Sequence, residues 1–378
     1  MKKQALFSWH FFRLKSKRKT LVKISSLFYM IFNMTCTGGD DSVSPPFRPE
    51  GWILLKLETQ SSRQLVIADD KLYLCAGIDG LFRITHPADA VDDWEFLGLN
   101  NLGFGGVMDV VVLTDTLVVG VFAQGAFPDV AGIYRSVDDG TTWTISDHGF
   151  DRNKLRNGTG IVGRLTQSKL NPRKLLAGCI GELLVYSSSD FGLSWNLLLG
   201  PMGETKLQAV AFNSNDNALW AGGIGPNTGA SLLYRSLDTG LTWQELFQQP
   251  HDQDLPANEV NDIVFDSVDD ATVYVSSYRV ILKSTDAGDT WVASFDTIDT
   301  DNFLNLSGNP VQSGELIACA GDSLYLTTDA GETWSAFQAK PKGQAFMNNM
   351  AVDWRKKILY VSAYNKADGL MRVYQLYF

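Results

Sequence analysis

The sequence predicts an all-β fold, a seven-bladed β-propeller, and three observations lead to that prediction. A motif of the form Ser/Thr-x-Asp-x-Gly-x-x-Trp occurs five times, and its aspartates are separated by 52, 48, 48 and 43 residues. Short apolar runs with the alternation of β-strands fill the intervals. No long segment has the apolar period of 3.6 residues that is typical of a helix. Units of four short strands repeated in a ring form a propeller, and closure of the ring protects the sheet edges.

Each position of the motif has a physical role in a tight hairpin. The aspartate, with a serine or threonine two residues earlier, can hydrogen-bond nearby backbone amides and so fold a turn. The glycine permits a positive φ in that turn, and the tryptophan begins the next strand and packs between neighbouring units. We expect the following motif residues to serve folding only: Asp138, Gly140, Trp143, Asp190, Gly192, Trp195, Asp238, Gly240, Trp243, Asp286, Gly288, Trp291, Asp329, Gly331 and Trp334.

Two further tryptophans extend the number of units to seven. Trp94 lies 49 residues before Trp143 and follows a strand pair of the same kind, and Trp52 lies 42 residues before Trp94. The C-terminal segment 358–378 supplies two strands but lacks a tryptophan strand. The simplest arrangement is a circle in which the N-terminal strand, residues 52–57, pairs into the last unit. We therefore predict one propeller domain over residues 51–378.

Innermost strands recur with the same period, and the residues at their heads align in one column. That column contains Gln64, Asp109, Arg164, Ala209, Asp262 and Asn349. Because innermost strands surround the axis of a propeller, we expect these side chains to lie near the central channel.

The first 35 residues differ from the rest and are typical of an export signal. They contain eight basic residues and no acidic ones, and an apolar run over 24–35 ends at Cys36. A cysteine in that place resembles the lipid-modified first residue of a bacterial lipoprotein. The polar stretch after it makes residues 36–50 a flexible tether. We favour a lipoprotein anchored to a bacterial membrane, periplasmic or on the cell surface; the alternative is an ordinary secretory signal with Cys36 incidental.

Charge and cysteine content exclude several classes of protein. Without the leader the chain keeps 24 basic residues against 42 acidic ones, a net charge of −18. This balance argues against nucleic acid as a partner, and it disfavours membrane contact except through the lipid anchor. Cys75, Cys179 and Cys319 lie in apolar runs without metal-ligand spacing, so we expect buried free thiols and no metal site. No cofactor is indicated, and we expect a monomer.

The repeated motif resembles the Asp-box, or BNR repeat, of sialidase-type propellers. The same repeat occurs in sortilin-like receptors, xyloglucanases and the photosystem II assembly factor family. The resemblance implies a structural role for the box, on the face away from the active centre of those proteins. It does not by itself imply an activity.

The sialidase activity of the wider fold family is rejected on sequence grounds. Phe82-Arg83-Ile84-Thr85 looks like the Phe/Tyr-Arg-Ile-Pro motif of those enzymes. It aligns, however, with the strands that enter the boxes, such as Ile133-Tyr134-Arg135-Ser136. Arg83 is therefore interpreted as a feature of the repeat.

A glycoside hydrolase remains the alternative function. Xyloglucanase-like hydrolases are similar in placing catalytic aspartates on inner strands, and Asp109 and Asp262 match that pattern. Inversion needs two carboxyl groups about 6.5–9.5 Å apart, one acid and one base. Those enzymes form their cleft between two propellers, whereas this chain predicts one. The competing interpretation of both aspartates is a polar, hydrated channel lining.

The leading hypothesis is a non-enzymatic propeller that binds a protein or glycan through its longest loops. By propeller connectivity the long connections 146–162 and 245–259 lie on the face opposite the boxes, and long loops on a rigid scaffold commonly carry binding sites. The first loop contains a basic cluster on an otherwise acidic protein. The candidate binding residues are Arg152, Lys154 and Arg156 in that cluster, and Arg164 near the axis.

Overall fold

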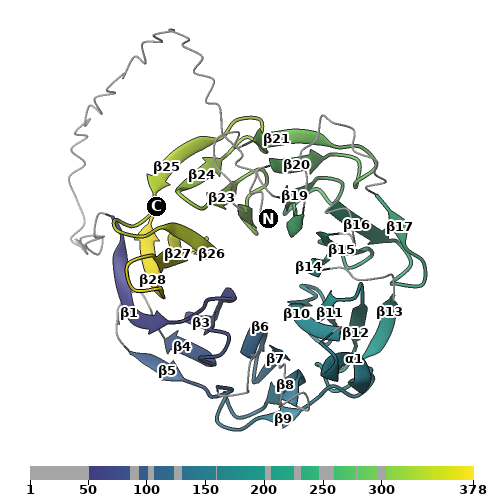
Figure 1. Ribbon diagram of the computed structural model, residues 1–378. Coiled ribbons are helices and arrows are strands. Elements are labelled where there is room, and N and C mark those ends of the chain that lie inside the picture. The colour runs from purple at the N-terminus through teal and green to yellow at the C-terminus, as the bar shows by residue number, and fades with distance from the viewer. Residues whose placement is uncertain are drawn as a thin grey trace, which may run out of the picture. The chain divides into compact units, whose positions relative to one another are not determined.

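The computed structural model describes residues 51–85, 93–100, 106–122, 130–158, 160–200, 206–224, 231–246, 259–277, 280–296 and 304–378. Within these residues, 28 strands form seven four-stranded antiparallel blades around a central axis (Figure 1). The predicted all-β, seven-bladed propeller is therefore confirmed. The leader, Cys36 and the tether lie outside the described residues, so their roles stay predictions.

The first four blades follow the chain in order, each from its innermost to its outermost strand. Blade 1 contains β2 (Gln64–Ala68), β3 (Lys71–Cys75), β4 (Leu81–Thr85) and β5 (Trp94–Phe96). Blade 2 contains β6 (Gly106–Leu113), β7 (Thr116–Phe122), β8 (Gly132–Ser136) and β9 (Thr144–Ile145). Blade 3 contains β10 (Gly160–Gln167), β11 (Leu175–Gly181), β12 (Val185–Ser188) and β13 (Asn196–Leu199). Blade 4 contains β14 (Lys206–Phe212), β15 (Leu219–Ile224), β16 (Ser231–Ser236) and β17 (Gln244–Glu245).

The remaining blades complete the ring, and the last one takes its outermost strand from the N-terminal end of the domain. Blade 5 contains β18 (Val260–Phe265), β19 (Val273–Ser277), β20 (Val280–Ser284) and β21 (Val292–Asp296). Blade 6 contains β22 (Leu304–Gly308), β23 (Leu316–Ala320), β24 (Ser323–Thr327) and β25 (Ser335–Ala339). Blade 7 contains β26 (Phe346–Asp353), β27 (Ile358–Asn365), β28 (Leu370–Tyr377) and β1 (Ile53–Thr59).

Closure of the ring occurs between β1 and β28, as the sequence predicts. The two strands pair antiparallel, with Ile53 opposite Gln375 and Thr59 opposite Met371. Leu55, fully buried, packs in a cluster that contains residues of blades 1 and 7. The N-terminal strand therefore belongs to the core of the closing blade, and β28 is not left with an unpaired edge.

The Asp-box hairpins have the side-chain bonding that their residue types predict. In blade 2, Ser136 Oγ donates to Asp138 Oδ1 at 2.7 Å and accepts from the Gly140 amide at 2.8 Å. Asp138 also accepts from the amide and hydroxyl of Thr142, at 2.9 and 2.6 Å. The hydroxyl at this last position was not part of our expectation. The other four hairpins repeat the pattern through Ser194, Thr242, Thr290 and Thr333.

Glycine is required in these turns for two reasons. Both central residues are left-handed, with φ of 57° at Ala287 and 96° at Gly288 in blade 5, as in a type I′ turn. A Cβ atom at Gly288 would also lie 2.4 Å from the Trp220 ring of the preceding blade. The motif glycine therefore permits both the turn and the close packing of neighbouring blades.

The two faces of the ring carry different connections. Strands alternate in direction, so the turns between first and second strands lie at the same end as the Asp-box hairpins. Hydrogen bonds join the two, for example from the Ala330 amide to the Gly314 carbonyl at 3.0 Å. We call this end the Asp-box face. The opposite end, which carries the connections between blades, is called the long-loop face.

Cations on third strands bind the Asp-box hairpin of the following blade. Arg83 pairs with Asp139, and Lys283 Nζ lies 2.8 Å from Glu332 Oε1. Arg235 Nη2 lies 2.9 Å from Asp289 Oδ1 in the same relation. Arg83, only 6% exposed, thus repeats a structural contact between blades, which supports its interpretation as a feature of the repeat.

Tryptophans link the blades at the rim. The indole N–H groups of Trp143, Trp243 and Trp52 donate to carbonyls at the end of the preceding outer strand. The donor–acceptor distances are 2.7, 3.2 and 2.8 Å, to Leu97, Leu198 and Ala339. The expected packing of tryptophan between units is observed.

Cys75, Cys179 and Cys319 are buried and free, as expected from their apolar surroundings. Among the described residues, none of the helical segments has the length and apolar character needed to cross a bilayer.

We predict that the closing strand contributes strongly to stability through its buried side. Leu55→Ala should lower the free energy of unfolding by about 2–5 kcal/mol, because it leaves a cavity in the core. Leu54→Ala, at a side chain 40% exposed on the same strand, should change it by less than about 0.5 kcal/mol. Urea unfolding followed by tryptophan fluorescence measures both. Equal effects of the two variants would contradict this account of closure.

We also predict that acid weakens the Asp-box hairpins. Hydrogen bonds from Thr290 and Thr333 lower the pKa values of Asp286 and Asp329 to about 2. An unfolded aspartate has a pKa near 3.9, so this stabilisation is present above about pH 4 and is lost as the pH falls through about 2. Asp286→Asn should therefore flatten the loss of the urea midpoint between pH 5 and pH 2. Asp296→Asn, outside a box, is the control and should leave that slope unchanged.

Candidate functional site

The residues of the aligned column, at the heads of the innermost strands, come directly after shifts in the register of strand pairing. In five blades one extra residue interrupts the register just before the column position. Such bulges bend a strand and redirect its side chains. The extra residues are Met108, Gly163, Gln208, Asn261 and Asn348.

Asp109 connects blade 2 to blade 3. Its side chain is buried, with Oδ1 accepting from the Val110 amide at 2.8 Å and Oδ2 accepting from the Leu165 amide at 2.9 Å. Leu165 belongs to the innermost strand of the next blade. Both carboxylate oxygens are therefore engaged by the protein backbone.

Burial raises the pKa of Asp109 to about 6. The positive charge of Arg164 and the two amide hydrogen bonds act in the opposite direction, and the nearby Asp262 adds to the increase. A raised pKa is a property that a general acid needs, but it also results from burying any carboxyl group. The pKa therefore does not separate a catalytic role from a structural one.

Asp262 makes the same connection between blades 5 and 6. Its Oδ2 accepts from the Leu306 amide at 3.0 Å, and the side chain is partly buried. Burial raises its pKa, while Arg164 and the Leu306 amide lower it. Asn349 repeats the relation in blade 7, because its Nδ2 donates to the Ser62 carbonyl at 3.0 Å. The column positions thus share a role in joining consecutive blades near the axis.

Arg164 lies at the centre of these contacts. Its Nε donates to the Gln208 carbonyl of the next blade at 2.6 Å, and Nη1 donates to Gln64 Oε1 of blade 1 at 2.9 Å. A guanidinium group has five N–H donors, so these two bonds leave donor capacity. Arg164 therefore both ties blades together and presents a cation near the channel.

A cavity of about 310 Å³ opens beside Arg164, and we call it the mouth pocket. It lies at the heads of inner strands and hence toward the long-loop face. Gly163 allows Ile180 to form one wall, since a Cβ at position 163 would lie 2.4 Å from Ile180 Cδ1. Ile180 also pairs with Lys206, which joins blades 3 and 4. The pocket is lined by Arg63, Met108, Gly163, Arg164, Ile180, Leu207 and Gln208.

Arg63 contributes an exposed positive charge to the mouth pocket. Its side chain is exposed, and within the described residues no acidic group pairs with it. Arg63 and the apolar wall of Met108, Ile180 and Leu207 were not among the candidate residues predicted from the sequence. Met108 is the extra residue of a bulge and Ile180 belongs to the second strand of blade 3, so neither stands in the aligned column of inner-strand heads.

The predicted basic cluster forms a short helix on the long-loop face, α1 (Arg152–Arg156). Asp151 caps it by accepting from the Asn153 amide at 2.9 Å. Arg152 Nη2 lies 3.1 Å from Asp147 Oδ2, and Lys154 pairs with Glu182. Arg152 and Lys154 are therefore paired with acidic side chains of the protein. Most of the second predicted connection, 245–259, lies outside the described residues, because only residues 245, 246 and 259 of it are described.

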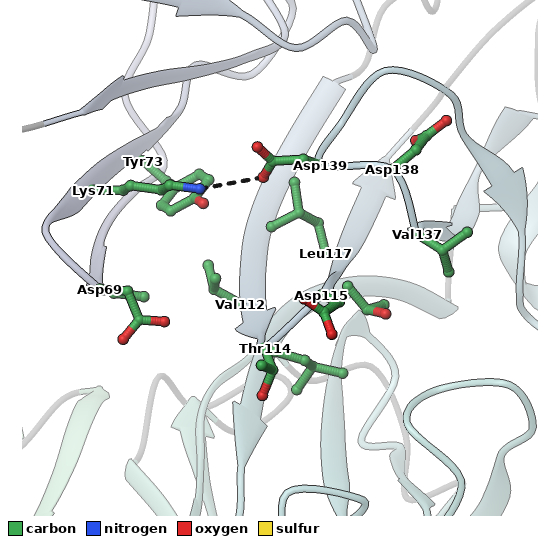
Figure 2. A pocket seen from close by; sticks show the side chains of 13 residues that line it. Asp69, Lys71, Tyr73, Val112, Thr114, Asp115, Leu117, Val137, Asp138 and Asp139 are labelled. Carbon is green, nitrogen blue, oxygen red and sulfur yellow. Dashed lines mark hydrogen bonds and ion pairs between the residues drawn. The ribbon is translucent and has the colours of Figure 1, made fainter.

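A second cavity, of about 350 Å³, lies between blades 1 and 2 on the Asp-box face (Figure 2). Two of the aspartates that line it, Asp138 and Asp139, are engaged in structural contacts. Asp138 belongs to the hairpin of blade 2, and Asp139 pairs with Arg83 and with Lys71, whose Nζ lies 3.4 Å away. Lys71 and Asp139 in its lining therefore serve a contact between blades 1 and 2.

Comparisons with known proteins support the propeller fold, but the similar proteins differ from one another in function. No family model matches the chain. In sequence it is 26% identical over 260 residues to the xyloglucanase Xgh74A of Acetivibrio thermocellus, and 25% identical over 284 residues to a xyloglucanase of a Paenibacillus species. These alignments cover 64% and 65% of this chain. The chain spans only about a quarter of each enzyme, 27% of its length.

Solved structures with the same fold include both binding proteins and enzymes. YCF48 from Cyanidioschyzon merolae matches with a TM-score of 0.59 and 14% identity, over 86% of this chain and 98% of its own. YCF48 bound to D1 peptide matches with the same TM-score and identity, over 87% and 96%. An ancestral GH74 enzyme matches with a TM-score of 0.52 and 19% identity, over 74% and 39%. At these identities the likeness establishes the propeller and no further property.

We predict that Asp109→Asn destabilises the protein although it is nearly isosteric. Asparagine offers one acceptor oxygen, whereas the carboxyl group keeps acceptor capacity on both oxygens even when it is protonated, so in the variant one of the two backbone N–H groups loses its partner. The cost should be about 1–3 kcal/mol in urea unfolding at pH 5. Asp262→Asn, which faces one such amide, should cost less.

The pH dependence gives a second measure of the same change. The folded pKa of Asp109, about 6, lies above that of an unfolded aspartate. Its proton uptake therefore stabilises the fold fully below about pH 4, and this contribution is lost as the pH rises through about 6. The Asn variant should lack that dependence. A wild type and a variant with parallel stability curves between pH 4 and pH 7 would contradict the burial of Asp109.

Proposed function

We propose that this protein is an exported, lipid-anchored, non-enzymatic propeller that binds a protein ligand at the mouth pocket of its long-loop face. The anchor is Cys36, with residues 36–50 as tether. The ligand group is a carboxylate next to an apolar side chain, as at the C-terminal end or an acidic turn of an extended segment.

The proposal rests on one observation: the acidic side chains at the channel mouth bind the protein's own backbone, whereas the arginines there do not use all of their donors in this way. Asp109 and Asp262 hold the backbone amides of neighbouring blades, whereas Arg63 is exposed beside a cavity and Arg164 has N–H donors that no described residue engages. Arginine binds carboxylates through paired N–H groups, and such charge-assisted bonds are stronger than neutral ones. Met108 and Ile180, both partly exposed, supply apolar wall beside the two cations.

The likeness to peptide-bound YCF48 supports a protein ligand over a glycan. It provides an example of a propeller of this shape and size that holds a peptide. Capture of a terminal carboxylate by a protein surface is also a recurring mode of peptide recognition. A cavity of about 310 Å³ accommodates one residue of such a segment rather than an oligosaccharide.

Glycoside hydrolysis is the second candidate, and the similarity to xyloglucanases favours it. The match covers 64% of this chain, and Asp109 and Asp262 influence each other electrostatically. One feature of the structure counts against it. Both carboxylates are engaged by backbone amides, and a general acid or base must reach the substrate directly or through one water.

The test measures peptide binding with free and amidated C-termini. The purified chain is added to arrays of decapeptides that end in different apolar residues, each made in both forms. We expect binding to the free form and at least about a tenfold loss on amidation, about 1.4 kcal/mol. Arg63→Ala should cause a similar loss without changing the urea midpoint. Arg355→Ala, an exposed arginine on the Asp-box face, is the matched control and should bind as wild type.

Xyloglucan hydrolysis by the same preparation separates the two candidates. The binding proposal expects no release of reducing ends. Cleavage by the wild type that is lost in Asp262→Asn, with an unchanged unfolding midpoint, would establish the hydrolase instead. Peptide binding that is indifferent to both amidation and Arg63→Ala would overturn the assignment of the mouth pocket.

A further inference from the structure

The chain enters the propeller on the Asp-box face. In five blades an Asp-box hairpin joins the third strand to the outermost one. Blade 7 has no such connection, because its third strand ends at Tyr377 and its outermost strand begins at Ile53, which pairs with Gln375. The Phe378 amide donates to the Lys357 carbonyl, in the turn between the first two strands of that blade, at 3.0 Å. Residues 51–53 thus occupy the place of the missing hairpin.

The same face exposes a set of aliphatic side chains. They lie in the hairpins or the inner turns of blades 2 to 6, and each is more than half exposed. Single exposed apolar residues are normal on a protein surface, but a set gathered on one face indicates an interaction surface. On the described part of the long-loop face, the comparable residues are Ile78 and Phe346, at 42% and 39%. The set contains Val137, Leu170, Leu193, Leu237, Leu241, Val268 and Val311.

A tether of this length restricts how the domain can turn. Cys36 lies 15 positions before Gly51, and a flexible chain of that length spans about 20 Å on average. A compact domain of this size has a radius of gyration of about 20 Å and is about 50 Å across. Turning the long-loop face to the bilayer would stretch the tether toward its full extension of about 50 Å. The entropy of the tether therefore favours one orientation.

We propose that the Asp-box face lies against the bilayer to which the chain is anchored, with its aliphatic side chains at the lipid surface and the mouth pocket directed away from it. This inference rests on the proposed anchor at Cys36. The exposed aliphatic side chains of this face would contact the interfacial region of a zwitterionic membrane. The mature net charge of −18 makes an anionic surface unfavourable, and the contact should weaken as anionic lipid is added.

The experiment fixes the anchor chemically, so that it does not depend on natural lipidation. The chain from Cys36 onward is coupled through that thiol to a maleimide phospholipid in phosphatidylcholine vesicles, since Cys75, Cys179 and Cys319 are buried. A bio-orthogonal amino acid carries a fluorophore at position 241, on the Asp-box face, or at position 367, in the exposed turn between β27 and β28. A nitroxide on the lipid headgroup quenches fluorophores near the membrane surface.

We expect quenching at position 241 to exceed that at position 367 several-fold. Equal quenching at the two positions, or stronger quenching at 367, would overturn the orientation. The triple variant Leu241→Ser, Val268→Ser and Val311→Ser, with the fluorophore at position 237, tests the lipid contact itself. The triple variant should show at least twofold less quenching than a control that carries the same label at position 237 and the substitution Val292→Ser. Val292 is an exposed residue at the rim. No difference between these two would overturn the role of the aliphatic set.

Failure of the proposed anchor has a separate signature. Mass spectrometry of the protein purified from a bacterial host reports whether Cys36 carries lipid. A native chain without lipid would overturn the proposed localisation. The quenching ratio in the chemically anchored vesicles would still decide the orientation that the fold imposes.

Discussion

Contact between consecutive blades is the constraint on which this structure depends. A single four-stranded blade with a twisted, half-apolar surface cannot bury both of its faces, so each blade is completed by its two neighbours. The ring therefore requires that the first and last blades meet, and pairing of β1 with β28 meets that requirement. With the closing strand in place, the core of blade 7 becomes continuous with that of blade 1.

Polar side chains join the blades at three radii, and this explains several residues that look functional in isolation. Near the axis, Asp109 and Asp262 accept amides from the next inner strand. On the Asp-box face, Arg83 and its equivalents hold the next hairpin. At the rim, tryptophan N–H groups bind carbonyls of the preceding blade. A repeat protein needs the same contact between each pair of neighbouring units. A charged residue that recurs along the repeat therefore indicates a structural role rather than a catalytic one.

The sequence allowed the fold to be predicted because the decisive information is local and repeated. The hairpin motif gives the number of units, and the missing tryptophan strand of the last unit gives the mode of closure. The candidate site was harder to predict from the sequence, because it combines residues of four blades. Met108, Gly163 and Gln208 line the mouth pocket only because bulges turn the strands there. The inner strands consequently begin two to four residues earlier than predicted in five blades, as at Gly160 rather than Arg164.

The basic cluster on α1 illustrates a related limit of sequence reasoning. A run of Arg152, Lys154 and Arg156 on an acidic protein suggests a free patch, but Asp147 and Glu182 approach it from other parts of the fold. Tertiary neighbours decide whether a surface charge is available, and they are not visible in a linear pattern. By contrast, Arg63 follows no motif and remains open to solvent.

Closure by opposite ends of the domain also has a consequence for folding kinetics. The strand that completes blade 7 is made before any other, whereas its partner β28 is made last. Hydrophobic surface on β1, including Leu55, therefore stays without its final contacts throughout synthesis. Pairing between distant parts of a chain is slow, because a large loop entropy must be overcome before the contacts form. Complete folding of the ring must accordingly follow synthesis of β28, and a propeller without β28 would present two unpaired strand edges on which copies of it could associate.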